Sequence, residues 1–200
     1  MIKSSEIIAF HEACLAAQTW PQVLPDAMPD AQPVWQWIAA NHRYNSQLWD
    51  EEDLARRRDV ADSEIAKNKR AIDGFNQARN DAAERVDEEI LVAVGKSEGL
   101  ENARQHSETA GMMIDRMSIM ALKIKAMAAQ AARPEATAEH RASCQGKLER
   151  LQEQRADLAR CLDGLLADLQ AGKAYFKIYR QFKMYNDPAL NPWLNGQKQG

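Results

Sequence analysis

The sequence predicts an all-α protein, in which an antiparallel four-helix bundle follows a short N-terminal helix and precedes a C-terminal amphipathic helix and an extended tail. Three observations favour this class. Apolar residues recur at helical spacing along four long segments, turn or capping residues separate these segments, and no segment alternates as a strand would. Two of the connections are short, as between antiparallel neighbours. We expect residues 1–200 to form one domain.

The N-terminal part, residues 1–32, is expected to contain a short helix and a proline-rich connector. The helix is predicted from about Ser5 to Ala17. Four prolines then follow within fourteen residues, which excludes a regular element there. Pro33 is the last of them and suits the first turn of a helix. The first bundle helix is therefore predicted from Pro33 to about Arg57.

The other three bundle helices start at capping residues and end near glycine or proline. Gly95 and Gly172 are expected to terminate the second and fourth helices, and Pro134 separates the third helix from the fourth. Ser107 is the expected N-cap of the third helix. The predicted ranges are about 63–94, 107–132 and 135–171.

Residues 173–200 are expected to form a short amphipathic helix followed by an extended tail. The helix is predicted from Tyr175 to Tyr185, with aromatic residues on one side and basic residues on the other. Two later steps, in which Asp or Asn precedes proline, disfavour helical backbone. The tail is therefore not expected to continue the helix.

Charge and composition limit the kinds of partner. The chain carries 29 acidic and 26 basic residues, a formal net charge of −3, which favours neither nucleic acid nor an anionic membrane surface. No apolar run approaches the length of a membrane span, and the N-terminal apolar patch is too short for a signal peptide. Three widely spaced cysteines suit a reducing compartment. We therefore expect a cytoplasmic protein, with homo-oligomerisation left open.

The first bundle helix changes character halfway along its buried face. At 100° per residue, the apolar stripe that contains Trp35 continues as His42 and Asn45. In the second bundle helix, Asn76 and Arg79 fall within the apolar arc. Burying such groups is costly unless they bond to one another or to a ligand. The pattern therefore points to a polar site in the interior.

Helical rise places these polar residues at one level of the bundle. At about 1.5 Å per residue, His42 comes level with the segment from Asp73 to Arg79, and Lys123 falls near the same height. Positive charge exceeds negative charge there, so Arg79 is expected to anchor an anionic group. His42 is the only candidate acid or base. The predicted ligand site comprises His42, Asn45, Asp73, Asn76, Arg79 and Lys123.

A second polar pair interrupts the apolar rows of the third and fourth bundle helices. Asp115 lies in one row and Arg155 in the other. We expect them to lie opposite one another and to form a direct structural ion pair, because buried pairs commonly fix helix register. The same structural interpretation remains the alternative for the group around His42.

Metal chemistry is the obvious enzymatic interpretation of a bundle with a polar core, and the sequence does not favour it. Ferritin-like di-metal sites need Glu-x-x-His on two helices. None of the four histidines has Glu three residues earlier. The chain also lacks HExxH, CxxC, a phosphate loop and a nucleophile elbow. We expect no metal and no cofactor.

Four separated stretches carry a resemblance to a known family. They are HRYNSQLWDEED, KRAIDGFNQARNDAAERVD, HSETAGMMIDRMSIMALKIKAM and QFKMYNDPALNP. Through them the chain resembles a bacterial family catalogued as domain of unknown function 4254, over roughly residues 5–195. The resemblance implies an all-helical cytoplasmic bacterial protein and an association with envelope-polysaccharide gene sets. It implies no activity.

Two classes of function follow. In the first, the interior site binds a small polar or anionic ligand, as a binding protein or an enzyme, and the resemblance suggests envelope-polysaccharide metabolism as its context. In the second, the chain is a non-enzymatic accessory protein or homo-oligomer whose buried polar network is structural. The aromatic segments from Trp20 to Trp37 and from Tyr175 to Tyr185 would then dock a partner.

Overall fold

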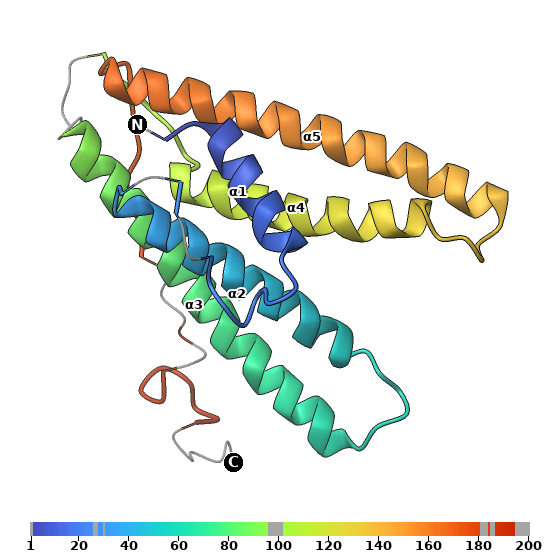
Figure 1. Ribbon diagram of the computed structural model, residues 1–200. Helices are drawn as coiled ribbons and strands as arrows, with labels where there is room; N and C mark the ends of the chain where they lie inside the picture. The colour runs from blue at the N-terminus through green and yellow to red at the C-terminus, as the bar shows by residue number, and fades with distance from the viewer. Residues whose placement is uncertain are drawn as a thin grey trace.

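A computed structural model describes residues 2–25, 28–29, 31–95, 102–180, 184 and 187–194. Within these ranges the protein is all-α, as predicted, with only two strands of two residues each. The elements are α1 (Ser4–Ala16), α2 (Val34–Leu54), α3 (Asp62–Val94), β1 (Arg104–Gln105), α4 (Ala110–Ala131), α5 (Ala138–Gln170) and β2 (Ala174–Tyr175) (Figure 1). None of the helices in these ranges is both long enough and apolar enough to span a membrane.

The four long helices form two antiparallel hairpins, α2 with α3 and α4 with α5 (Figure 1). The two hairpins diverge from the region where they meet, and α1 lies across α4 and α5 there (Figure 1). Helix α4 packs against α1, α2, α3 and α5, so it is the central element. The predicted helix pairs are present, whereas the predicted arrangement of four helices about one common axis is not confirmed.

The hydrophobic core lies where the two hairpins and α1 meet. The Phe10 ring of α1 packs edge-on against Trp35 of α2, with ring centroids 5.6 Å apart. Ile114 and Met117 of α4 are fully buried. The second half of α5 contributes most of its buried leucines, whereas its first half buries mainly Cys144 and Leu148. The outer part of this hairpin is therefore thinly packed, and the polar groups of interest lie next to the shared core.

The start of α4 differs from the prediction. Its N-cap is Thr109, whose hydroxyl accepts a hydrogen bond from the Met112 amide at 3.2 Å, so the expected cap at Ser107 is wrong. The pairing of β1 with β2 and the bond from the His106 amide to the Tyr175 carbonyl keep the chain extended as far as His106, and Ser107 and Glu108 then form a bend. The helix can begin only after this pairing ends.

The predicted C-terminal helix is also wrong for the described residues up to Arg180. Ala174 and Tyr175 form β2, which pairs in parallel with β1, and residues 176–180 have no regular structure. Ala174 and Phe176 are fully buried on either side of the half-buried Tyr175, which is the alternation of an extended chain. The rest of the predicted helix falls mostly on residues 181–183 and 185, which lie outside the described ranges.

Candidate functional site

His42 lies in the interior, as predicted. Its side chain is fully buried, and its Nδ1 atom lies 2.8 Å from the Ser118 hydroxyl of α4. The imidazole stacks on His11 of α1 and on Trp20, with ring centroids 4.2 Å and 5.1 Å apart. His42 therefore belongs to an aromatic cluster that holds α1 and the connector against α2.

Both stacked histidines are neutral at pH 7. Burial lowers the pKa of His42 to about 3, and a contact with the His11 backbone offsets part of this effect. Burial, followed by the proximity of His42 and Arg155, lowers the pKa of His11 well below its usual value. A fully buried imidazole with so low a pKa is poorly suited to exchange protons with a substrate. Its position therefore does not favour the predicted catalytic role of His42.

The low pKa of His42 predicts an acid-sensitive core. Relative to a His42→Phe variant, the wild type should lose about 2 kcal/mol of unfolding free energy between pH 7 and pH 5. In this window the unfolded His42 takes up a proton, whereas the folded side chain binds it only near pH 3. Stability is therefore complete above the unfolded pKa of about 6.5 and falls as the pH is lowered. Equilibrium denaturation of both proteins at the two pH values measures the effect.

The comparison with the His42→Phe variant is necessary because Asp87 changes the stability in the opposite direction as the pH falls. Burial raises the pKa of this carboxyl to about 7, so the folded state binds a proton that the unfolded state releases. Asp87 is present in both proteins, and its contribution cancels in the difference. A difference in stability that stays constant from pH 7 to pH 5 would show that the folded His42 takes up a proton over this range as readily as the unfolded side chain does, which contradicts a lowered pKa.

A hydrogen-bond network lies beside His42 and joins α2 to α4. Oδ1 of Asp115 accepts bonds from the side-chain amides of Asn41 and Asn45, at 2.8 Å and 2.9 Å. The Asn45 amide also donates to the Ser118 hydroxyl at 3.0 Å. The Asn41 amide reaches the backbone carbonyl of Arg79 on α3, at 3.3 Å. The network thus connects three helices, because Asp115 joins α4 to α2 and the Asn41 amide joins α2 to α3.

Arg79 lies next to this network, but its guanidinium forms no close hydrogen bond with Asp115. Its Nε atom lies 3.8 Å from Oδ1 of Asp115, and the side chain is 22% exposed. Nε is itself buried and makes no hydrogen bond within the described part of the chain. Another guanidinium nitrogen donates a long bond of 3.4 Å to Asn80. The guanidinium is attracted to Asp115 but lacks the bidentate partner that arginine usually finds when it is partly buried.

The predicted ion pair between Asp115 and Arg155 is wrong. Asp115 faces α2 and α3, as described above, whereas Nη1 of Arg155 bonds to Oε1 of Glu12 on α1 at 2.6 Å. The reason is the position of α1, which packs against α4 and α5 and supplies the carboxylate that Arg155 meets. Arg155 and Asp115 therefore belong to separate polar contacts.

Arg79 lines a cleft of about 450 Å³ between α3, the start of α4 and the C-terminal segment. We call this the Arg79 cleft. Each of its four carboxylates has a hydrogen-bond or ion-pair donor within the protein. Asp115 has the two amides, Asp87 has the Gly111 amide at 2.6 Å, Glu84 has Arg180 at 2.6 Å, and Glu108 has Arg116 at 2.6 Å.

Two cations that line the Arg79 cleft, Arg79 and Lys177, are less well paired than its carboxylates, whereas Arg116 bonds to Glu108. Lys177 lines the cleft and makes no ion pair or hydrogen bond within the described ranges. Arg79 has only long contacts among the described residues, at 3.8 Å with Asp115 and at 3.4 Å with Asn80. Burial raises the pKa of Asp87 to about 7, although the Thr109 side chain and the Gly111 amide act against this, so Asp87 carries only part of a negative charge at neutral pH. Arg79 and Lys177 are therefore the cations of the cleft that lack a close carboxylate among the described residues.

A second cleft, of about 270 Å³, lies between α2 and α4 on another side of Arg79. Asn45 and Trp49 line it together with Glu52 and Arg56, which form an exposed ion pair at 3.2 Å. Arg79 lines both clefts, so it occupies the point where the buried network meets solvent.

The structure does not bring every predicted site residue together. His42, Asn45 and Arg79 lie around the same network, and Asn76 is half-buried one turn before Arg79 on α3. Asp73 is exposed and forms an ion pair with Lys69 on the surface of α3. The prediction of Asp73 as an interior residue is therefore wrong, because it lies at the edge of the polar stripe.

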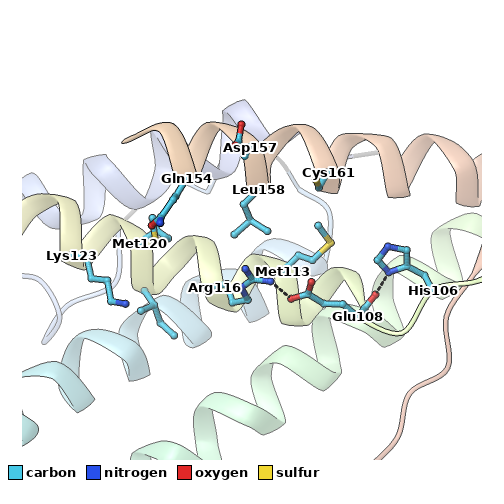
Figure 2. Close-up of a pocket in the computed structure, with 11 residues that line it drawn as sticks. His106, Glu108, Met113, Arg116, Met120, Lys123, Gln154, Asp157, Leu158 and Cys161 are labelled. Carbon is cyan, nitrogen blue, oxygen red and sulfur yellow. Dashed lines mark hydrogen bonds and ion pairs between the residues drawn. The ribbon is translucent and has the colours of Figure 1, made fainter. Parts of the chain in front are cut away.

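Lys123 is likewise separate from Arg79. It is exposed and lines a cleft between α4 and α5 (Figure 2). Leu122, one residue earlier, lines the cleft between α2 and α4. One residue turns a helix by about 100°, so equal height along the bundle does not place Lys123 on the same face.

The site also includes residues that were not predicted from the sequence as site residues, namely Asn41, Asp87, Ser118 and Lys177. Asn41 is four residues before Asn45 and Ser118 is three residues after Asp115, so helical spacing could have found both. Asp87 also lies in the second predicted helix. Its partner, the Gly111 amide at the start of α4, is distant in the sequence, so helical spacing could not reveal this contact. Lys177 could not be placed because a helix was predicted there.

Comparisons with known proteins give a family and no activity. The profile of a family described as "Protein of unknown function (DUF4254)" matches residues 35–178, which span α2 from its second residue to the end of α5 and all described lining residues of the Arg79 cleft except Tyr179. No curated protein matches the chain, and no solved structure matches it.

Proposed function

Since the chain belongs to the DUF4254 family of unknown function, its activity has to be inferred from the site, and we propose that it binds a small polar ligand with an anionic group in the Arg79 cleft. One observation carries the proposal. The four carboxylates of the cleft all have donors within the protein, whereas Arg79 and Lys177 lack close acceptors among the described residues.

The physical argument concerns the guanidinium of Arg79. A charge-assisted bond between guanidinium and carboxylate is about 2.8 Å long, and the contact with Asp115 is 3.8 Å. A buried donor without a partner costs about 1 to 3 kcal/mol. A phosphate or carboxylate offers two oxygens to the planar guanidinium and would recover this free energy. Lys177, which lines the same cleft, would supply a second positive charge.

The position of the cleft in the fold also favours an anion. It lies at the N-terminal end of α4, where the helix dipole is positive. Asp87 already satisfies the Gly111 amide at this end, so the backbone contributes through its dipole and the side chains supply the direct contacts. Both an enzyme and a binding protein are compatible with this arrangement.

We place this function in the cytoplasm. Cys14, Cys144 and Cys161 are free thiols, two of them buried, which suits a reducing compartment. A context in envelope-polysaccharide metabolism rests on the family resemblance alone.

The alternative function is that of an interaction protein. Tyr179 and Trp193 are 73% and 82% exposed, and large exposed aromatic side chains are frequent anchors of protein interfaces. In this alternative the Asp115 network only stabilises the fold, and Arg79 belongs to it.

An Arg79→Met variant distinguishes the two functions, because it keeps the aliphatic stem and removes the charge. Without ligand it should be as stable as the wild type. In a thermal-shift screen against inorganic phosphate, sugar phosphates and nucleotides, a ligand at a hundred times its dissociation constant should raise the wild-type melting temperature by about 5 to 10 °C. The Arg79→Met variant should lose this shift.

The matched control is Arg70→Met, which removes an exposed arginine of the same helix outside both clefts. It should keep both the stability and the ligand-induced shift. If Arg79→Met instead destabilises the unliganded protein by several kcal/mol, or if no compound of the screen stabilises the wild type, the interaction protein becomes the better description.

A further inference from the structure

The hairpin of α4 and α5 contains a cleft of about 690 Å³ that is separate from Arg79 (Figure 2). Side chains from both helices point into it, and we call it the α4–α5 cleft. Its volume lies within the range of pockets that bind small organic molecules, about 300 to 1,000 Å³.

One end of the α4–α5 cleft presents two polar groups from facing helices. Lys123 of α4 and Gln154 of α5 lie toward the same end of the cleft (Figure 2). Neither makes a hydrogen bond or an ion pair within the described ranges. An ammonium group and a side-chain amide are both donors, and together they can bind the two oxygens of one carboxylate.

The other charged groups of the cleft are already paired. Glu108 bonds to Arg116 at 2.6 Å, and Asp157 forms an ion pair with Arg160 on the surface of α5. Lys123 is therefore the one cation in the described part of the cleft that is without a counter-charge. The charge that would complement the cleft is a single negative one, at the end formed by Lys123 and Gln154.

The middle of the α4–α5 cleft is apolar. Met113 and Met120 contribute from α4, and Leu158 contributes from α5. Methionine side chains are flexible and adapt to ligands of different shape. Lys123 is ten residues from Met113, which corresponds to about 15 Å along a helix. The apolar floor is thus long enough for an extended hydrocarbon chain, and it starts next to the two donors.

We propose that the α4–α5 cleft binds a medium-chain carboxylate, with the carboxylate on Lys123 and Gln154 and the hydrocarbon chain over Met113, Met120 and Leu158. The charge of the head group and the apolar chain are both required, because each matches a different part of the cleft. This site does not depend on the Arg79 cleft, and either site can exist without the other.

Titration calorimetry with decanoate below its micelle concentration tests the proposal. Saturable binding with one site is expected for the wild type. Lys123→Met should weaken decanoate binding at least tenfold, since it removes the charge and keeps the stem. Lys147→Met, at an exposed lysine of α5 outside the cleft, is the matched control and should bind as the wild type does. Arg79→Met should also bind decanoate normally.

Further measurements can overturn the proposal. Decanol has the chain without the charge and acetate has the charge without the chain, so equally tight binding of either one would contradict the assignment. A second variant, Met120→Glu, places a negative charge on the apolar floor and should also abolish decanoate binding. No saturable binding of decanoate, or binding only to vesicles of anionic phospholipid, would mean that the cleft does not take a free carboxylate.

Discussion

Replacement of Asp115 by alanine is expected to lower the free energy of unfolding by about 3 kcal/mol, because one carboxylate oxygen serves two buried amides. Asn41 and Asn45 are 1% and 3% exposed, so neither amide can turn to water when Asp115 is lost. The side chain of Asp115 is itself only 16% exposed. Denaturant titration at pH 7 measures the loss.

Asp115→Asn separates hydrogen bonding from charge. The asparagine keeps an oxygen in the place of Oδ1, so the two amides retain their acceptor and the expected loss is only about 1 kcal/mol. Equal losses for Asp115→Asn and Asp115→Ala would mean that the negative charge, rather than the acceptor, stabilises the network.

A double-mutant cycle between Asp115→Asn and Arg79→Met connects this network to the proposed function. The contact between the two side chains is long, at 3.8 Å, and has no second bond. We expect a coupling energy below about 1 kcal/mol, as for weak ion pairs. A coupling of several kcal/mol would show that Arg79 forms a strong ion pair with Asp115. Its guanidinium would then not be available to bind an anionic ligand.

The sequence predicted α1 to α5 well because each of these helices is encoded by local periodicity and by its own terminal residues. Gly95 ends α3 and Pro33 precedes α2, as expected. The relative orientation of the two hairpins depends on which side chains meet at the helix contacts, and no local pattern encodes these contacts. The short β1–β2 pair was missed for the same reason, since Arg104 and Ala174 are distant in the chain.

The interior location of His42 and Asn45 could be predicted because both continue an apolar stripe. The residues that they contact could not be predicted. An apolar stripe shows which face of a helix is buried, but it does not show which other helix packs against that face. The placement of α1 is the main example. It brings His11 onto His42 and Glu12 onto Arg155, so the polar residue of α5 finds its partner in a helix outside the predicted bundle.

The contact between α3 and α4 offers the sharpest test of the fold around the Arg79 cleft. Gly111 lies so close to α3 that a Cβ atom there would be 2.2 Å from the Ala83 carbonyl oxygen and 2.9 Å from the Asp87 carboxyl group. Both values are far below van der Waals contact, and the nearest atom belongs to the backbone. We expect Gly111→Ala to lower the free energy of unfolding by about 3 kcal/mol, because overpacking forces the helices apart.

Gly146→Ala is the matched control, because Gly146 lies within α5 and a Cβ atom there would meet nothing within 4 Å. Alanine is a better helix former than glycine, so this variant should be more stable than the wild type by about 0.5 to 1 kcal/mol. The two substitutions are chemically identical and should have opposite signs in denaturant titrations. If Gly111→Ala were also stabilising, α3 and α4 could not approach as closely as described. The bond from the Gly111 amide to Asp87, and with it the wall of the Arg79 cleft, would then need a different geometry.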